Sequence, residues 1–129
     1  MADTAHAKFF LVDEIEWPSE QPASAPKELV EEAQRLGARR KFLARGEGGY
    51  YSQVSEFPAG YMVPMHSHDH NEMLVIMKGS CTMLGGDGPT LESGDSAVLI
   101  ANHEYGFVAG DDGMTFMTIR TGEASTTVT

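Results

Sequence analysis

Glycine recurs at short intervals from Gly46 to Gly113, and this spacing is the feature of the sequence that most restricts the fold. Between the glycines lie short runs rich in Val, Ile, Tyr, Phe and Met, most of which favour strands. Short strands at nearly regular spacing, separated by glycine turns, are typical of a sandwich or barrel of antiparallel strands. We therefore predict an all-β fold, with strands at 42–44, 50–57, 62–66, 73–78, 81–84, 95–100, 105–108 and 114–120.

The N-terminal third of the chain has a different pattern. Residues 9–17 alternate loosely between apolar and acidic side chains, which predicts an edge strand or an extended arm. From Pro26 to Gly37 the apolar side chains recur at helical spacing, so this segment is the one helix that we expect. The predicted organisation is an arm and helix over 1–40, a barrel over 41–121 and a flexible tail over 122–129.

The charge balance restricts the partners of the protein. The chain carries 9 Lys and Arg against 19 Asp and Glu, which gives a formal net charge of −10. Nucleic-acid binding draws on clustered Lys and Arg, so this balance argues against a nucleic-acid partner. The single cysteine, Cys81, cannot form an internal disulfide and is expected to be a small buried hydrophobe. No signal peptide or membrane span is recognisable, so we expect a cytoplasmic protein without a membrane partner.

A histidine cluster is the strongest chemical signal in the sequence. His66, His68, His70 and Glu72 occupy alternate positions. Because residues two apart on a strand point to one face, His66 and His68 can direct two imidazoles to one point. Imidazole and carboxylate ligands suit Fe, Zn, Ni, Mn or Cu, and we predict one such divalent metal per chain. Residues 69–71 are expected to form a turn, with His70 at the rim and Glu72 at the head of the next strand.

The alternative interpretation of the cluster is a set of exposed polar side chains in a hairpin loop. Apolar runs at 61–65 and 73–77 flank it, which favours a position inside a sheet. Ionisable groups in apolar surroundings need a partner, and a metal satisfies several of them together. The methionines in and near these runs fill a core or line a pocket for apolar ligands; they are Met62, Met65, Met73, Met77 and Met83.

The cluster belongs to a longer pattern formed by Gly60, His66, His68, Glu72 and Gly79. These residue types at these intervals resemble the first motif of the cupin superfamily. The resemblance implies a small single-domain, metal-dependent cupin. Its fold would be a jelly-roll barrel, also called a double-stranded β-helix, with one short N-terminal helix. The resemblance also implies that the two histidines and the glutamate are metal ligands.

A second stretch, from Gly94 to Phe107, is similar to the second cupin motif but departs from it. The family's fourth metal ligand, a histidine, corresponds to Tyr105, and His103 lies two residues earlier. Three readings stay open: His103 completes the metal shell through a shifted loop, Tyr105 binds as phenolate or acts as an acid, or water fills the place. A cation facing Tyr105 can lower the pKa of its phenol. The alternative role of this ring is to fill the barrel mouth beside Phe107.

The site hypothesis assigns metal binding to His66, His68, Glu72 and His103, and catalysis to Glu72 and Tyr105. The preferred function is a metal-dependent dioxygenase that acts on a small apolar carbonyl, enol or phenolic compound between methionine-rich, aromatic-lined walls. The first alternative is a non-redox cyclase, isomerase or lyase, for example one like a polyketide cyclase, with the metal as Lewis acid. A small-molecule binding cupin without catalysis is the second alternative, which the weakened second motif favours.

The apolar run Phe9–Val12 would be an exposed strand if it were left alone. Small cupins often pair their sheets or exchange N-terminal arms. We therefore predict a homodimer.

Overall fold

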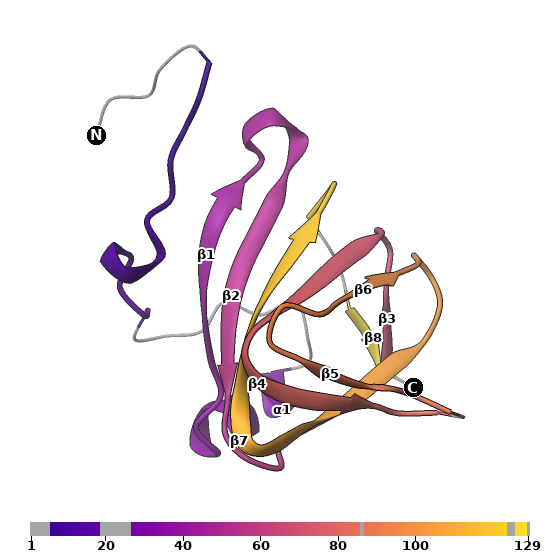
Figure 1. The fold of residues 1–129 in the computed structure, drawn as a ribbon. Coiled ribbons are helices and arrows are strands. Elements are labelled where there is room, and N and C mark those ends of the chain that lie inside the picture. Colours follow the sequence, from indigo (N-terminus) through magenta and orange to yellow (C-terminus); the bar gives the residue numbers. More distant parts are fainter. Residues whose placement is uncertain (1–5, 19–26, 86, 124–125, 129) are drawn as a thin grey trace.

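The computed structural model describes residues 6–18, 27–85, 87–123 and 126–128. Within them, eight strands form one curled antiparallel sheet, and a short helix precedes it (Figure 1). The elements are α1 (Lys27–Arg35), β1 (Arg39–Arg45), β2 (Tyr51–Phe57), β3 (Met62–His68), β4 (Glu72–Met83), β5 (Thr90–Glu92), β6 (Ser96–Leu99), β7 (Tyr105–Arg120) and β8 (Thr126–Val128), with single 3-10 turns η1 (Val12–Glu14) and η2 (Glu47–Gly49).

Strand β7 holds the sheet together. One of its edges pairs with β2 and then with β3, while the other edge pairs with β4 along most of its length. The strand order is β1-β2-β7-β3-β8, and β4 also pairs with β5 and β6. The predicted all-β fold with a short N-terminal helix is confirmed. The concave side of the sheet holds the buried core, which includes Leu74, Ile76, Cys81, Phe107 and Phe116.

Two strands of the structure are bent at a glycine, where the sequence pattern predicts that each is two separate strands. Strand β4 spans the predicted strands 73–78 and 81–84, and β7 spans 105–108 and 114–120. Gly79 and Gly113 have φ angles of +75° and +73°, and they adjoin each other where the two strands bend. A Cβ atom on Gly79 would collide with the carbonyl oxygen of Gly113. Glycine here permits a close approach of two backbones inside continuous strands, and does not reverse the chain.

Two short strands lie outside the predicted set. Strand β5 pairs with β4, and β8 pairs with β3 along the segment from His66 to His68. In place of the flexible tail predicted for 122–129, residues 126–128 therefore form a strand. The backbone edge of β3 supplies hydrogen-bond partners to this segment, whose Thr and Val residues favour an extended backbone but form too short a run to predict a strand.

The N-terminal segment lies alongside β1 as an extended arm (Figure 1). Of the two predicted forms, edge strand or arm, the structure has the arm, with one 3-10 turn at Val12–Glu14. Lys41 is buried, and its Nζ donates hydrogen bonds to the carbonyls of Val12 at 2.6 Å and Ile15 at 2.9 Å. The same ammonium lies 4.5 Å from the ring centre of Trp17. One buried cation thus fixes the arm to the barrel.

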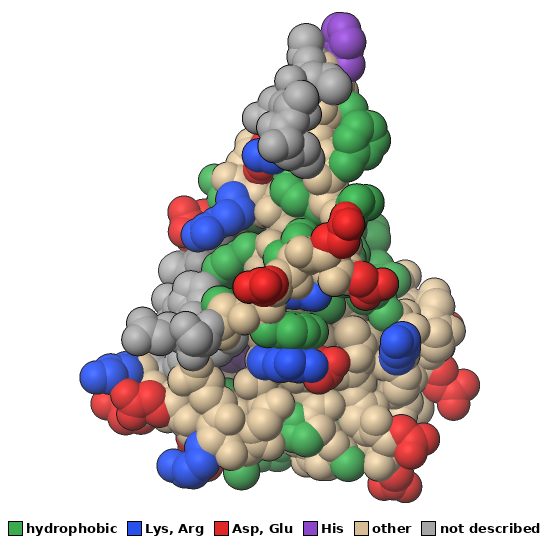
Figure 2. Space-filling view, turned by 90° about the vertical axis from the view of Figure 1, so that its left-hand side faces the viewer, with side chains coloured by type: hydrophobic (Ala, Val, Ile, Leu, Met, Phe, Trp, Pro, Cys, Tyr) green, Lys and Arg blue, Asp and Glu red, His purple; other side chains and the backbone are tan. Residues whose placement is uncertain are grey.

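Figure 2 shows the face that carries this arm, with acidic, basic and hydrophobic side chains interspersed on it. Helix α1 is confirmed within the segment 26–37. In the part of the chain that the structure describes, no helix has the length and apolar character needed to cross a membrane.

The Gly79→Ala variant tests the close approach of β4 and β7. Its Cβ meets backbone, whereas a Cβ on Gly94, which also has a positive φ of +92°, meets open space. We expect Gly79→Ala to lower the free energy of unfolding by about 2 kcal/mol more than Gly94→Ala, since strain at positive φ is common to both and the collision is not. Urea unfolding of both variants measures this difference. Equal losses would contradict the role of the bend.

The predicted homodimer can be tested by measuring the mass of the protein in solution. Phe9 and Leu11 are 65% and 60% exposed in the single chain. Light scattering at micromolar concentration should give twice the 14.0 kDa chain mass. Replacement of both residues by Ser should shift the mass towards the monomer, because the apolar surface that a partner would cover is lost. A monomeric mass for the parent protein contradicts the prediction.

Candidate functional site

A cavity of about 670 Å³ lies between strands β2, β3, β4 and β7, with residues of α1 on one side. This is a size typical of small-molecule sites. Its wall is largely apolar and includes the aromatic rings of Phe57, Phe107 and Phe116, as predicted. Of the five predicted methionines only Met62 lines it. The others lie at different strand positions, and Met73, for example, faces outward and is 43% exposed.

The predicted histidines enter this cavity from the end of β3. His66 and His68 are two residues apart on one strand, and both side chains are buried. Their rings meet edge to face, with centres 4.9 Å apart. The Nδ1 atom of His66 lies 2.8 Å from the carbonyl oxygen of Pro64, which orients this ring. Alternation along β3 therefore brings the two imidazoles to one wall, as the spacing predicts.

Glu72 faces the histidines from the first position of β4. The predicted turn at residues 69–71 is confirmed, and it carries the chain from one strand to the next. The Glu72 side chain is 2% exposed, and its Oε2 lies 3.5 Å from His68 Nε2. A buried carboxylate needs compensating polar contacts, and this one has two hydrogen bonds in addition to the contact with His68.

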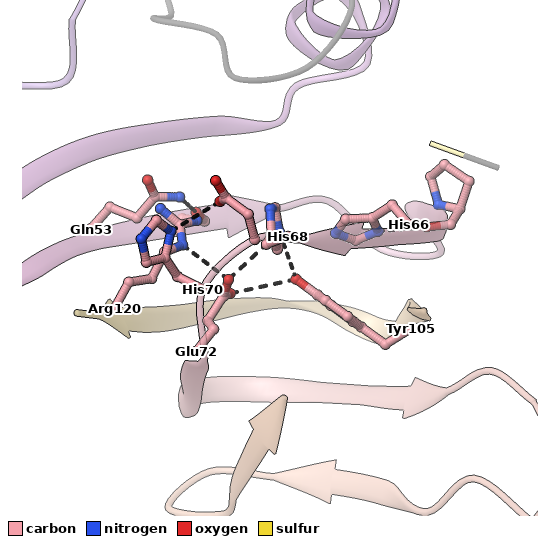
Figure 3. A network of polar contacts seen from close by, with 10 residues as sticks. Gln53, His66, His68, His70, Glu72, Tyr105 and Arg120 are labelled. Atoms are coloured by element: carbon pink, nitrogen blue, oxygen red, sulfur yellow. Dashed lines mark hydrogen bonds and ion pairs between the residues drawn. The ribbon is translucent and has the colours of Figure 1, made fainter. Parts of the chain in front are cut away.

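The partners of Glu72 form a compact polar network (Figure 3). Arg120, the last residue of β7, donates from Nε to Glu72 Oε2 at 3.0 Å. The Tyr105 hydroxyl donates to Glu72 Oε1 at 3.5 Å and lies 3.1 Å from His68 Nε2. The two oxygens of the carboxylate thus have different surroundings: Oε2 faces the cation and the imidazole, and Oε1 faces the phenol.

Tyr105 holds its proton firmly in this arrangement. Burial raises the pKa of its phenol, the Glu72 carboxylate raises it further, and the Arg120 guanidinium lowers it by a smaller amount. The Tyr105 hydroxyl donates a hydrogen bond to Glu72, which is the arrangement expected of the acid among the open readings.

The structure does not bring the other chemical candidates into this network. His103 is exposed, its Nδ1 lies 3.0 Å from the carbonyl oxygen of Ala101, and its side chain lines a smaller hollow outside the main cavity. His70 pairs with its neighbour Asp69 at the rim. Cys81 is fully buried, and burial raises the pKa of its thiol, as expected for a hydrophobic role.

Arg120 is the site residue that sequence reasoning missed. It lies at an inward position of β7, in alternation with Phe116 and Thr118, and all three line the cavity. The sequence could have indicated this residue, because Arg120 shares the alternating positions of Phe116, and an arginine that points into a core needs a buried partner.

The donor set suits a divalent transition metal in its chemistry. His66, His68 and Glu72 supply two imidazoles and one carboxylate to one buried wall. The 3.5 Å between His68 Nε2 and Glu72 Oε2 is near the separation of about 3 Å that two ligands with bonds of roughly 2.1 Å leave. Among the described residues, however, no three His, Cys, Asp or Glu side chains form an assembled metal-binding group, and Arg120 is the cation that contacts Glu72.

The raised pKa of Tyr105 predicts a loss of stability in alkali. An unfolded tyrosine loses its proton near pH 10, whereas the folded phenol retains it, so the folded state binds more protons above that pH. Stability therefore falls as pH rises past about 10. In metal-free protein, Tyr105→Phe should flatten this fall in the free energy of unfolding, and Tyr50→Phe, an exposed control, should not. Identical slopes for the two variants would contradict the burial of an intact phenol.

No family model matches the chain, and no curated protein matches it. Solved structures do. An RmlC-like cupin from Shewanella frigidimarina is 16% identical, with TM-score 0.66 over 91% of this chain and 93% of the other. A candidate acetylacetone dioxygenase from Methylibium petroleiphilum is 19% identical, with TM-score 0.67 over 96% and 83%. The polyketide cyclase RemF from Streptomyces resistomycificus is 16% identical, with TM-score 0.66 over 92% and 81%.

At these identities the comparisons establish the fold and leave the reaction open. They agree with the curled antiparallel sheet. The fold predicted from the resemblance is thus confirmed: this chain has the fold of the cupin superfamily.

Proposed function

We propose that the chain is a metal-dependent enzyme that transfers a proton on a small carbonyl or enol compound, as a non-redox isomerase, cyclase or lyase does. The observation that carries this proposal is the Tyr105 phenol in the cavity, in contact with His68 and Glu72. The proposal reverses the order of the two sequence hypotheses, because a neutral phenol directed at a carboxylate is a group for proton transfer.

A divalent transition metal held by His66, His68 and Glu72 would polarise a substrate carbonyl as a Lewis acid. Tyr105 holds a proton at its hydroxyl oxygen, where a substrate in the cavity can receive it, and the same oxygen can take up the proton that the substrate releases, so the phenol is regenerated. Glu72 Oε1 accepts the hydrogen bond of that phenol and fixes its direction, while Arg120 holds the opposite oxygen of the carboxylate. The aromatic wall excludes water from the reacting part of the substrate. The contacts of Tyr105 with His68 and Glu72 support this role for its phenol.

The dioxygenase hypothesis keeps support from the donor set itself. Two histidines and one carboxylate are the ligand combination of non-haem iron oxygenases, which bind substrate and O2 at the remaining positions. The solved structures that share this fold include proteins named for each of the two reaction types, so the fold does not distinguish the two reactions.

The proposed ligands can be tested by elemental analysis of purified protein. We expect about one transition-metal ion per chain in the parent and almost none in the His66→Ala/His68→Ala double variant, since two of three ligands are gone. His103→Ala is the matched control, because this histidine lies outside the cavity. Metal content equal to that of the parent in the double variant would refute the ligand assignment, and loss in His103→Ala would make His103 a ligand.

The reaction type can be tested by deuterium exchange. Metal-loaded protein should accelerate exchange of the protons next to the carbonyl of small ketones and diketones in D2O, which NMR follows. Tyr105→Phe should slow this exchange by about a hundredfold or more, the usual contribution of a general acid, and Tyr50→Phe should not. Uptake of O2 by Fe(II)-loaded protein without any exchange would instead establish the dioxygenase. Ligand binding with neither activity would indicate a binding module.

A further inference from the structure

Three neutral polar side chains lie together in the wall of the cavity. They are Gln53 and Ser55 on β2 and Thr118 on β7, and each is at most 5% exposed. Gln53 and Thr118 are directly paired across the two strands, and Ser55 lies two residues further along β2. Paired residues, and residues two apart on a strand, share one face of a sheet. The three side chains therefore form one neutral polar patch.

Apolar side chains border the neutral polar patch. Leu74 on β4 pairs with Thr118, and Phe116 on β7 pairs with Ser55; both are buried and line the cavity. A polar group in such surroundings is costly unless it has a hydrogen-bond partner. Inside the patch, Gln53 Nε2 donates to Ser55 Oγ at 3.5 Å, which is a long distance for such a bond. The patch is thus only weakly satisfied by its own members.

The Thr118 hydroxyl independently points to a ligand in the cavity. Its oxygen is buried and has no hydrogen-bond partner in the part of the chain that the structure describes. Buried hydroxyls are nearly always satisfied, and Thr118 lines the cavity, so a bound molecule can reach it. Valine would fill the same space without an unpaired oxygen, so packing alone does not explain a threonine here.

The neutral polar patch lies one step along the sheet from the proposed catalytic network. Thr118 is two residues before Arg120 on β7, and the Arg120 guanidinium holds Glu72. Two residues of a strand span about 7 Å. Figure 3 shows Gln53 beside Arg120, on the side of the network away from His66. A substrate whose carbonyl lies beside the network can therefore place a second oxygen against the patch.

We propose that Gln53, Ser55 and Thr118 form a subsite for a hydroxyl group of the substrate. An amide and two hydroxyls both donate and accept hydrogen bonds, as a substrate hydroxyl does, whereas an anion only accepts them. The proposal rests on the proposed function, because it places the carbonyl of the same substrate beside Glu72 and Tyr105. It narrows the substrate class to carbonyl compounds that carry a hydroxyl about 7 Å from the carbonyl, across an apolar or aromatic body.

Calorimetric titration of the purified protein with two neutral ketones tests this subsite. 4-Hydroxyacetophenone and 4-methylacetophenone share the ketone and the ring, and they differ in a hydroxyl against a methyl of similar size. A purely apolar pocket prefers the methyl compound, because a buried hydroxyl without a partner is costly. We expect the hydroxyl compound to bind about tenfold more tightly at about pH 6, where a phenol is uncharged. Equal affinity, or tighter binding of the methyl compound, would overturn the subsite.

Thr118→Val and Thr115→Val are matched variants on β7. Thr115 lies three residues earlier, at an outward position of the strand and outside the cavity. Thr118→Val should weaken binding of the hydroxyl compound by about fivefold to tenfold and leave the methyl compound unaffected, whereas Thr115→Val should change neither. Because the Thr118 oxygen has no partner in the described structure, urea unfolding should show no loss of stability in Thr118→Val. Equal affinities of the two variants for the hydroxyl compound would refute the role of Thr118.

Gln53→Met tests the amide in the same titration. Methionine fills a similar volume without a strong donor or acceptor. We expect the preference for the hydroxyl compound to fall by about threefold to tenfold. An unchanged preference would exclude the amide from the subsite. If this variant does not fold, the comparison of Thr118→Val with Thr115→Val still decides the proposal.

The two proposals fail separately. A preference for the hydroxyl compound that Thr118→Val abolishes, in a protein without deuterium exchange, keeps the subsite and refutes the proton-transfer function. Exchange without any preference for the hydroxyl compound keeps the function and refutes the subsite. Both probes carry the same ketone, so their comparison does not depend on whether a metal is bound.

Discussion

The pairing of β4 with β7 is the constraint on which both the core and the site depend. The two strands lie side by side for most of their length and bend together where Gly79 meets Gly113. This register sets Glu72 opposite Arg120, so the buried carboxylate and its guanidinium come from directly paired positions. A slip by one residue would turn every inward side chain outward. The ion pair and the apolar core therefore demand the same register.

The fold could be predicted from the sequence because its signals are local. Runs of β-forming residues fix most strands, and the spacing of His66, His68 and Glu72 fixes the end of β3, the turn and the start of β4. The division of β4 and β7 into shorter strands is an error with one physical cause. A glycine marks a turn in most chains, but at Gly79 it permits contact with another backbone, which depends on a partner more than thirty residues away. No local pattern contains that information.

Spacing along the chain was enough to predict His66, His68 and Glu72, whereas Tyr105 was predicted only from the resemblance to the second cupin motif, and Arg120 was not predicted. Alternation along β3 is enough to place the histidines together, and the next strand brings Glu72. Tyr105 and Arg120 reach the same point from the two ends of β7, and their positions depend on how that strand crosses β3 and β4. Residues that reach the site through the pairing of distant strands cannot be predicted from spacing along the chain.

The contact of β8 with β3 has a practical consequence. The last strand pairs with the backbone of His66, Ser67 and His68, so the C-terminal residues brace the strand that presents both imidazoles. A truncation before Thr126 would remove this brace and loosen the histidines without touching them. A recombinant protein for metal or substrate work should therefore retain residues 126–128.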